Sequence, residues 1–152
     1  MPAFLADTSG LEAFVQKKAL RRMDHYSKMA LLGAYLALED AGEPDSDRNR
    51  LGIVVASGYG ASRSTYAFLD SFLEGNDTFS SPIHFSNSVH NAAAANISIT
   101  LGITGPCLTV SQFDMSVPSA LITAVEWLNE ERVDKVLFGS VDEYCDLLFH
   151  YI

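Results

Sequence analysis

The sequence predicts an α/β fold in which buried strands alternate with helices. Three short apolar runs rich in β-branched residues are typical of strands, and LGIVVAS at 51–57 is continuous, as in a strand buried on both faces. At least one segment with apolar residues at helical spacing separates each run from the next. This alternation favours strands that are mainly parallel and are layered against helices.

The first predicted helix covers residues 24–41, after a start with no regular pattern. Asp24 or Ser27 can cap its N-terminus, because both side chains accept hydrogen bonds from free backbone N–H groups. Apolar residues then recur at three- and four-residue steps. Gly42 followed by Pro44 ends the pattern.

The remaining elements follow in order. The strand at 51–57 leads through the turn GYGAS into a helix over about 63–73. After the loop EGNDTFSSP, a helix rich in small residues covers 88–102 and ends at Gly102. The last three elements are a strand at 107–111, a helix at 117–130 and a strand at 135–141.

Composition excludes several classes of function. At 152 residues, 48% hydrophobic and 19% charged, the chain is typical of one globular domain. Its formal net charge of −9 argues against a nucleic-acid partner, which requires a basic face. No apolar run approaches the roughly 18 residues that span a bilayer. We expect no membrane association, and since no secretory signal is visible we expect a cytoplasmic protein.

The basic residues are unevenly distributed. Lys17, Lys18, Arg21 and Arg22 place four of the ten Lys and Arg side chains within six positions. In an acidic chain such a cluster can dock an acidic partner. An ordinary solvated helix face is the alternative, because exposed charges contribute little to stability and are common on helices.

Neither the cysteines nor the glycines indicate a cofactor. Cys107 and Cys145 are too few for a disulfide framework, lack the spacing of a metal site, and are expected to be buried structural thiols. The turn SGYGAS follows a strand, but it lacks the third spaced glycine of a dinucleotide fingerprint and the lysine of a phosphate loop. We therefore expect no metal and no cofactor.

Four strings together carry a family resemblance. RRMDHYSKMALLGAYLALEDAG, VVASGYGAS, SVHNAAAANISITLGITGP and VLFGSVDE occur in the order and at the spacing of the N-terminal half of β-ketoacyl-acyl carrier protein synthases. The resemblance covers about residues 17–144. It implies a thiolase-like fold, in which residues 1–152 form one N-terminal domain, half of the full fold, with a five-stranded mixed sheet flanked by helices. It also implies an acyl carrier protein as partner, and either a homodimer or a heterodimer with a synthase subunit.

The resemblance also locates a candidate active site. In the family, a nucleophilic cysteine lies on the turn from a strand into a helix, where a thiol has a depressed pKa. Counting forward from Gly105-Pro106 and backward from the strand after Asp134 both place Asp114 at this position. A carboxylate would form a mixed anhydride instead of a thioester, and Cys107 lies seven residues upstream. We expect Asp114 to be a helix cap or a remnant of a lost active site, and not a nucleophile.

Further site residues follow from the same resemblance. Tyr59 and Phe113 correspond to the acyl pocket, and a tyrosine at position 59 would shorten or close it. Lys18, Arg21 and Arg22 match the basic residues that dock the acidic carrier protein, and Asn91 is expected to hydrogen-bond a neighbouring turn. The family's two catalytic histidines and its lysine lie beyond Ile152, and the four histidines present match none of them: His25, His84, His90 and His150.

Three hypotheses of function remain from the sequence. The first is a β-ketoacyl synthase-like protein of fatty acid or polyketide biosynthesis that does not condense, resembles chain-length factors, and binds carrier protein or a synthase. The second is half of an acyltransferase or decarboxylase, completed by a C-terminal half or a partner chain, with Asp114 as general base. The third is a structural dimerisation module without a ligand.

Overall fold

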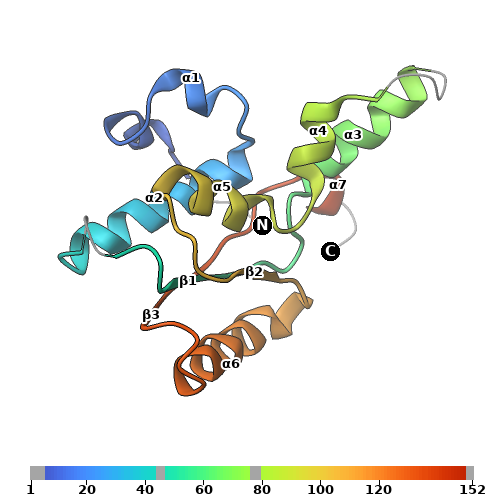
Figure 1. The fold of residues 1–152 in the computed structure, drawn as a ribbon. Helices are drawn as coiled ribbons and strands as arrows, with labels where there is room; N and C mark the ends of the chain where they lie inside the picture. Colours follow the sequence, from blue (N-terminus) through green and yellow to red (C-terminus); the bar gives the residue numbers. More distant parts are fainter. Residues whose placement is uncertain (1–5, 44–46, 76–79, 150–152) are drawn as a thin grey trace.

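The computed structural model describes residues 6–43, 47–75 and 80–149. Its sheet is short and lies across the middle of the molecule (Figure 1). Strand β1 (Leu51–Ala56) is central and parallel to both of its neighbours, β2 (Cys107–Val110) and β3 (Lys135–Ser140). Ile53 pairs with Cys107, and Leu51 pairs with Lys135. The predicted parallel α/β layering is confirmed.

The five-stranded mixed sheet is wrong for the described part of the chain, which has three strands, all parallel. The physical reason is visible in the sequence: only three runs are apolar and β-branched enough for strands. The residues after β3 form a loop and the short helix α7 (Asp146–Phe149) instead of adding to the sheet.

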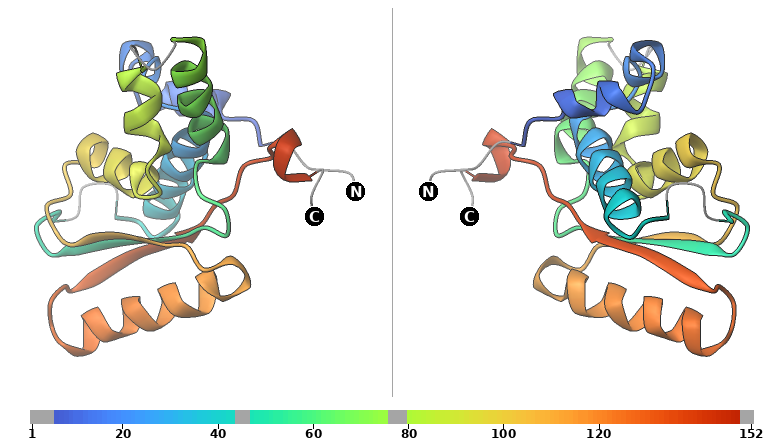
Figure 2. Two further views of the ribbon diagram at one scale, coloured as in Figure 1. Left: turned by 90° about the vertical axis from the view of Figure 1, so that its right-hand side faces the viewer. Right: turned by 90° about the vertical axis from the view of Figure 1, so that its left-hand side faces the viewer.

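Helices cover both faces of the sheet (Figure 2). On one face lie α2 (His25–Asp40) and α5 (Ala92–Leu101), and on the other lies α6 (Ser116–Asn129). All six residues of β1 are buried, as expected of a central strand between two helical layers. Leu31, Ile53 and Ile97 lie in the larger core, beneath α2 and α5.

The predicted helices are confirmed with small shifts in their bounds, except one. The predicted helix at 88–102 starts later, as α5 at Ala92, because Val89 is extended at φ −73° and ψ 138°, and a helix that was not predicted, α4 (Pro82–Ser88), precedes it. Ser81 caps α4 by accepting a hydrogen bond from the His84 amide. α3 (Ser62–Glu74) packs beside α4, and this pair stands to one side of the sheet (Figure 1).

The N-terminal region is more regular than expected. A 3-10 helix, η1 (Ser9–Ala13), and a short helix, α1 (Lys17–Leu20), precede α2. Leu11 and Leu20 are buried in the core beneath α2, which fixes this region to the body of the protein. Asp24 caps α2 by accepting a hydrogen bond from the Ser27 amide at 3.0 Å, as the sequence predicts.

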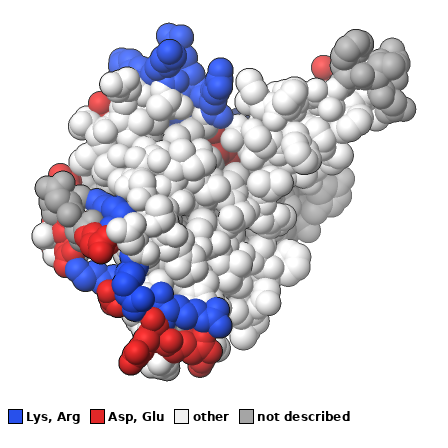
Figure 3. All heavy atoms as spheres, in the orientation of Figure 1, with Lys and Arg blue, Asp and Glu red and all other residues white. Residues whose placement is uncertain are grey.

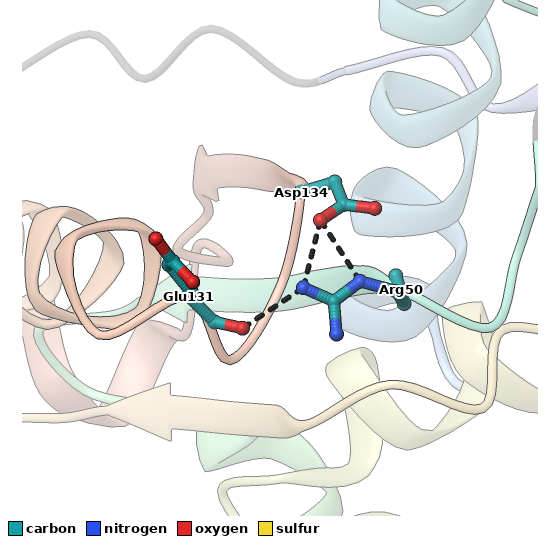
Figure 4. Close-up of polar contacts among 3 residues, drawn as sticks. All are labelled: Arg50, Glu131 and Asp134. Atoms are coloured by element: carbon teal, nitrogen blue, oxygen red, sulfur yellow. Dashed lines mark hydrogen bonds and ion pairs between the residues drawn. The ribbon is translucent and has the colours of Figure 1, made fainter.

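A bidentate contact closes the end of the sheet away from the candidate site (Figure 4). The Arg50 guanidinium donates to Asp134 at 2.8 Å and to the carbonyl of Glu131 at 2.8 Å. The hydrogen bond from Arg50 lowers the pKa of Asp134, and the charge of Arg50 adds to this effect. This contact joins the start of β1 to the turn between α6 and β3.

Candidate functional site

The turn from β2 into α6 is a tight elbow, as predicted. A 3-10 turn, η2 (Phe113–Met115), lies between the strand and the helix. Phe113 has φ +49°, a left-handed conformation that is uncommon for a bulky residue and is found where surrounding structure holds the backbone in place. The elbow therefore projects Phe113 and Asp114 outward from the end of the sheet.

Ser116 provides the hydrogen bonds that hold the elbow. Its side chain is buried, and its hydroxyl accepts from the Gln112 amide at 2.8 Å. The same oxygen lies 2.7 Å from the carbonyl of Phe113 and 2.8 Å from the carbonyl of Ser57, so that its one proton is shared between two acceptors. Ser116 thus joins the elbow to the end of β1.

Asp114 is exposed and does not cap the helix. No side chain caps the N-terminus of η2 or of α6. The expectation of a cap is therefore wrong, because Asp114 is the middle residue of the 3-10 turn and not the extended residue that precedes a helix. Within the described residues its carboxylate accepts no hydrogen bond.

Tyr59 and Phe113 meet at the elbow, although they are far apart in sequence. Their rings pack edge to face, with centroids 5.7 Å apart. The exposed fractions are 39% for Tyr59 and 69% for Phe113, so the two rings form a surface pair instead of lining an enclosed cavity. Gly60 follows with φ +63°, the tight turn that the sequence predicts there.

Asp142 positions the turn that carries Tyr59. Its carboxylate accepts from the Ser57 hydroxyl at 2.7 Å, the Gly58 amide at 2.9 Å and the Tyr59 amide at 3.0 Å. Sequence reasoning did not single out Asp142. The signal was present, because an acidic residue two positions after a parallel strand lies at the same end of the sheet as the residues after the neighbouring strand.

A second set of carboxyls lies beneath the start of α3. Glu143 is buried and accepts from the Arg63 amide at 3.0 Å, and burial raises the pKa of its carboxyl. Asp24 accepts from the Ser64 hydroxyl at 2.9 Å. Tyr26 is fully buried nearby, and this burial raises its pKa to about 12.

Neither thiol lies at the elbow. Cys107 is half-buried at the start of β2, the end of the strand opposite the elbow, and burial raises its pKa. Asn91 is exposed and donates to the sulfur of Cys107 at 3.9 Å, so the expected hydrogen bond to a neighbouring turn is wrong and the partner is a strand residue. Cys145 is buried. Because burial raises its pKa, Cys107 carries little thiolate, which is the reactive form.

The basic cluster is exposed at one end of the molecule, over α1 (Figure 3). Lys17 pairs with Glu12 at 2.8 Å, whereas Lys18, Arg21 and Arg22 form no ion pair with any described residue.

No group of three or more metal-ligating side chains occurs in the described ranges. None of the helices there is long and apolar enough to cross a membrane.

Comparison with known proteins gives consistent matches. The sequence profile of the β-ketoacyl synthase N-terminal domain matches residues 1–148. The putative polyketide β-ketoacyl synthase 1 of Streptomyces virginiae is 30% identical over 145 residues, which is 90% of this chain and 34% of that protein. The chain spans about a third of the length of the curated relatives it matches.

Solved structures of low sequence identity share the fold. One is the ketosynthase ApeO in complex with its chain length factor ApeC from Xenorhabdus doucetiae, with a TM-score of 0.73 and 23% identity over 91% of this chain and 54% of that chain. Another is a type II polyketide synthase acyl-carrier protein, AntF, in complex with its ketosynthase AntDE. It has a TM-score of 0.80 and 19% identity over 94% of this chain and 41% of that chain.

Proposed function

Since the chain belongs to the β-ketoacyl synthase family, through the N-terminal domain of that family, we propose that it is a non-condensing member. In this proposal it binds an acyl carrier protein or a synthase partner, in fatty acid or polyketide biosynthesis, and forms no acyl-enzyme. The proposal places it closer to a chain-length factor than to a condensing subunit.

The observation that carries the proposal is Asp114 at the elbow. The geometry is that of a strand-to-helix nucleophile turn, with backbone N–H groups at the start of a helix that suit an oxyanion. The residue presented there is a carboxylate, and both thiols lie elsewhere: Cys145 is buried, and burial raises the pKa of Cys107. An acyl group on a carboxylate would be an anhydride, which water hydrolyses far faster than a thioester.

The partner class rests on charge. Lys18, Arg21 and Arg22 are exposed beside one another and form no ion pair in the described part of the chain. Similar ketosynthase structures have a chain length factor or an acyl-carrier protein as partner. Unpaired cations on an otherwise acidic protein favour an acidic protein partner by steering and orienting its approach.

Intact-protein mass spectrometry tests the lack of acylation. After incubation with a small acyl thioester, we expect no mass gain in the native chain and a stoichiometric gain in Asp114→Cys, because the elbow then presents a thiol at a helix N-terminus. Cys107→Ala in both backgrounds controls for acylation of the strand thiol. A stoichiometric adduct on the native chain that Asp114→Asn removes would show that the proposal is wrong.

Binding to holo acyl carrier protein tests the partner. The triple variant Lys18→Gln, Arg21→Gln, Arg22→Gln should raise the dissociation constant by about tenfold or more, because several charge pairs at an interface each contribute up to about 1 kcal/mol. Arg132→Gln, which removes a cation at the far end of the molecule, is the matched control. Equal affinity of the triple variant and the native chain would favour a structural module instead.

A further inference from the structure

An apolar groove lies between α2 and the sheet. It has a volume of about 380 Å³. Ala30, Gly33 and Ala37 of α2 line one side, and Ile53 of β1 and Leu137 of β3, which pair in register, line the other. The groove shares no lining residue with the basic cluster. It is therefore a separate feature of the surface.

The groove follows β3 along the edge that faces away from β1. Every residue from 137 to 142 lines it, although successive side chains of a strand point to opposite faces of a sheet. A groove that contacts residues of both orientations reaches around the edge of the strand to its backbone. In the described part of the chain β3 pairs with β1 alone. The other edge of β3 thus presents backbone N–H and C=O groups with which a further extended segment can pair.

Two glycines show that the groove has room for such a segment. Gly33 on α2 and Gly139 on β3 both line it, and both are exposed. A Cβ built on either of them has no atom within 4 Å. An apolar side chain can therefore enter between the helix and the strand edge without displacing a described residue.

Ala6 identifies the segment that fits. Ala6 itself lines the groove, and residues 1–5, MPAFL, precede it directly and include no charged side chain. Five extended residues span at most about 17 Å. This reach is close to the roughly 20 Å of a strand as long as β3, which has six residues.

We propose that residues 1–5 occupy this groove as an extended segment that pairs with the free edge of β3. Because side chains alternate along an extended chain, either Phe4 or Leu5 then enters the space beside Gly33 and Gly139. Burial of an apolar side chain and pairing of edge backbone groups both favour this arrangement. The inference does not depend on the proposed function.

Hydrogen exchange of the β3 amides in the full chain tests the inference. We expect the amides on the free edge of β3 to exchange about tenfold faster or more in the double variant Phe4→Ser, Leu5→Ser than in the native chain. The amides of α6, on the other face of the sheet, serve as the internal reference and should keep their native rates (Figure 2).

The matched control is Leu73→Ser with Ile99→Ser. It also removes two apolar side chains, but these are 75% and 80% exposed and lie outside the groove. The control should leave the exchange of β3 unchanged.

Filling the groove from the helix is a second test. Gly33→Leu places a side chain in the space that the segment would occupy, so it should speed the exchange of the β3 edge by a similar factor in the native chain. In the Phe4→Ser, Leu5→Ser background it should have no further effect, because the two changes act on one contact. If the double variant does not fold, Gly33→Leu alone still tests the inference.

Two outcomes would overturn the inference. Equal exchange of β3 in the native chain, the double variant and Gly33→Leu would show that residues 1–5 do not occupy the groove. Protection of the β3 edge that rises with protein concentration would show that a second copy of the chain pairs there instead.

Discussion

The hydroxyl of Ser116 lies where two backbone segments meet, the elbow at Gln112 and Phe113 and the residue after β1, Ser57. One short side chain therefore supports both the left-handed residue of the elbow and the end of the central strand. The candidate site depends on this oxygen more than on the carboxylate of Asp114, which accepts no hydrogen bond from any residue that the structure describes. The conformation of the elbow therefore does not depend on which side chain stands at position 114.

We expect Ser116→Ala to lower the free energy of unfolding by about 1–3 kcal/mol, because it leaves buried backbone groups without a partner. Urea unfolding followed by circular dichroism measures the change. Ser119→Ala, three residues on, is the control: its hydroxyl bonds the exposed Gln112 side chain, so that the loss should stay within about 0.5 kcal/mol. Equal effects of the two variants would contradict the assignment.

Glu143 should make stability depend on pH. Burial raises the pKa of this carboxyl above its usual value of 4.5, so that the folded protein holds the proton to a higher pH than the unfolded chain does. Below about pH 4 both states carry the proton, and as the pH rises the folded state loses stability relative to the unfolded state.

We therefore expect Glu143→Gln to be more stable than the native chain at about pH 7, with a gap that narrows toward about pH 4. The glutamine oxygen can still accept the Arg63 amide. Urea midpoints at several pH values measure the gap. A gap that stays constant with pH would show that the carboxyl carries no buried charge.

At this scale, sequence reasoning found the exposed parts of the site and missed its supports. Asp114, Tyr59 and Phe113 follow from a strand-to-helix pattern and a family resemblance. Ser116 and Asp142 act through hydrogen bonds to backbone atoms of Ser57 and Gly58, which follow β1, and these partners can be paired only when the parallel register is known. A local pattern does not contain that register.

At the scale of elements, Gly105 sets how closely β2 approaches β1. A Cβ built on Gly105 would lie 2.2 Å from the carbonyl oxygen of Leu51, which is backbone of the central strand and has no room to move. The glycine before β2 is therefore a requirement of strand pairing, and the Gly-Pro string has a packing reason in this fold.

We expect Gly105→Ala to destabilise the protein by about 2 kcal/mol or more, as overpacking against backbone does. Gly33→Ala on α2 is the matched control, since nothing lies within 4 Å of its added Cβ and alanine favours a helix. The control should raise stability by about 0.5–1 kcal/mol. Thermal unfolding measures both variants, and we expect the same substitution to lower stability at position 105 and to raise it at position 33. A Gly105→Ala variant as stable as the native chain would contradict the close approach of β2 to β1.

Elements were predictable where a long apolar pattern decided them. The central strand and α2 lie close to their predicted bounds. The strand is buried on both faces and is therefore continuously apolar, and the helix is buried along one side, so that its apolar residues recur at helical spacing. Helix α4 was missed, although Ser81 and Pro82 form a helix start of their own. Its seven residues are too few to show an apolar period.

The whole molecule exposes an apolar surface on α6. Ser116, Ala120 and Ala124 face the sheet, while larger apolar residues face outward. Among these, Ile122 is 63% exposed and Val125 is 51% exposed. A contiguous apolar face of this kind is typical of an interface with another chain or domain.

We expect the chain on its own to self-associate through this face, and Ile122→Lys with Val125→Glu to lower the apparent mass. Size-exclusion chromatography with light scattering at several concentrations measures it. Asn129→Lys, an exposed polar position on the same helix, should leave the mass unchanged. If the native chain is strictly monomeric at high concentration, α6 is not a self-association surface.

The central position of β1 also has a consequence for biosynthesis. Ile53 pairs with Cys107 and Leu51 with Lys135, so that β1 is synthesised well before β2 and β3, the two strands that it pairs with. At roughly 5–20 residues per second, a ribosome leaves this apolar strand unpaired for seconds. The nascent chain should therefore depend on chaperones, and slower translation at low temperature should not by itself improve its yield.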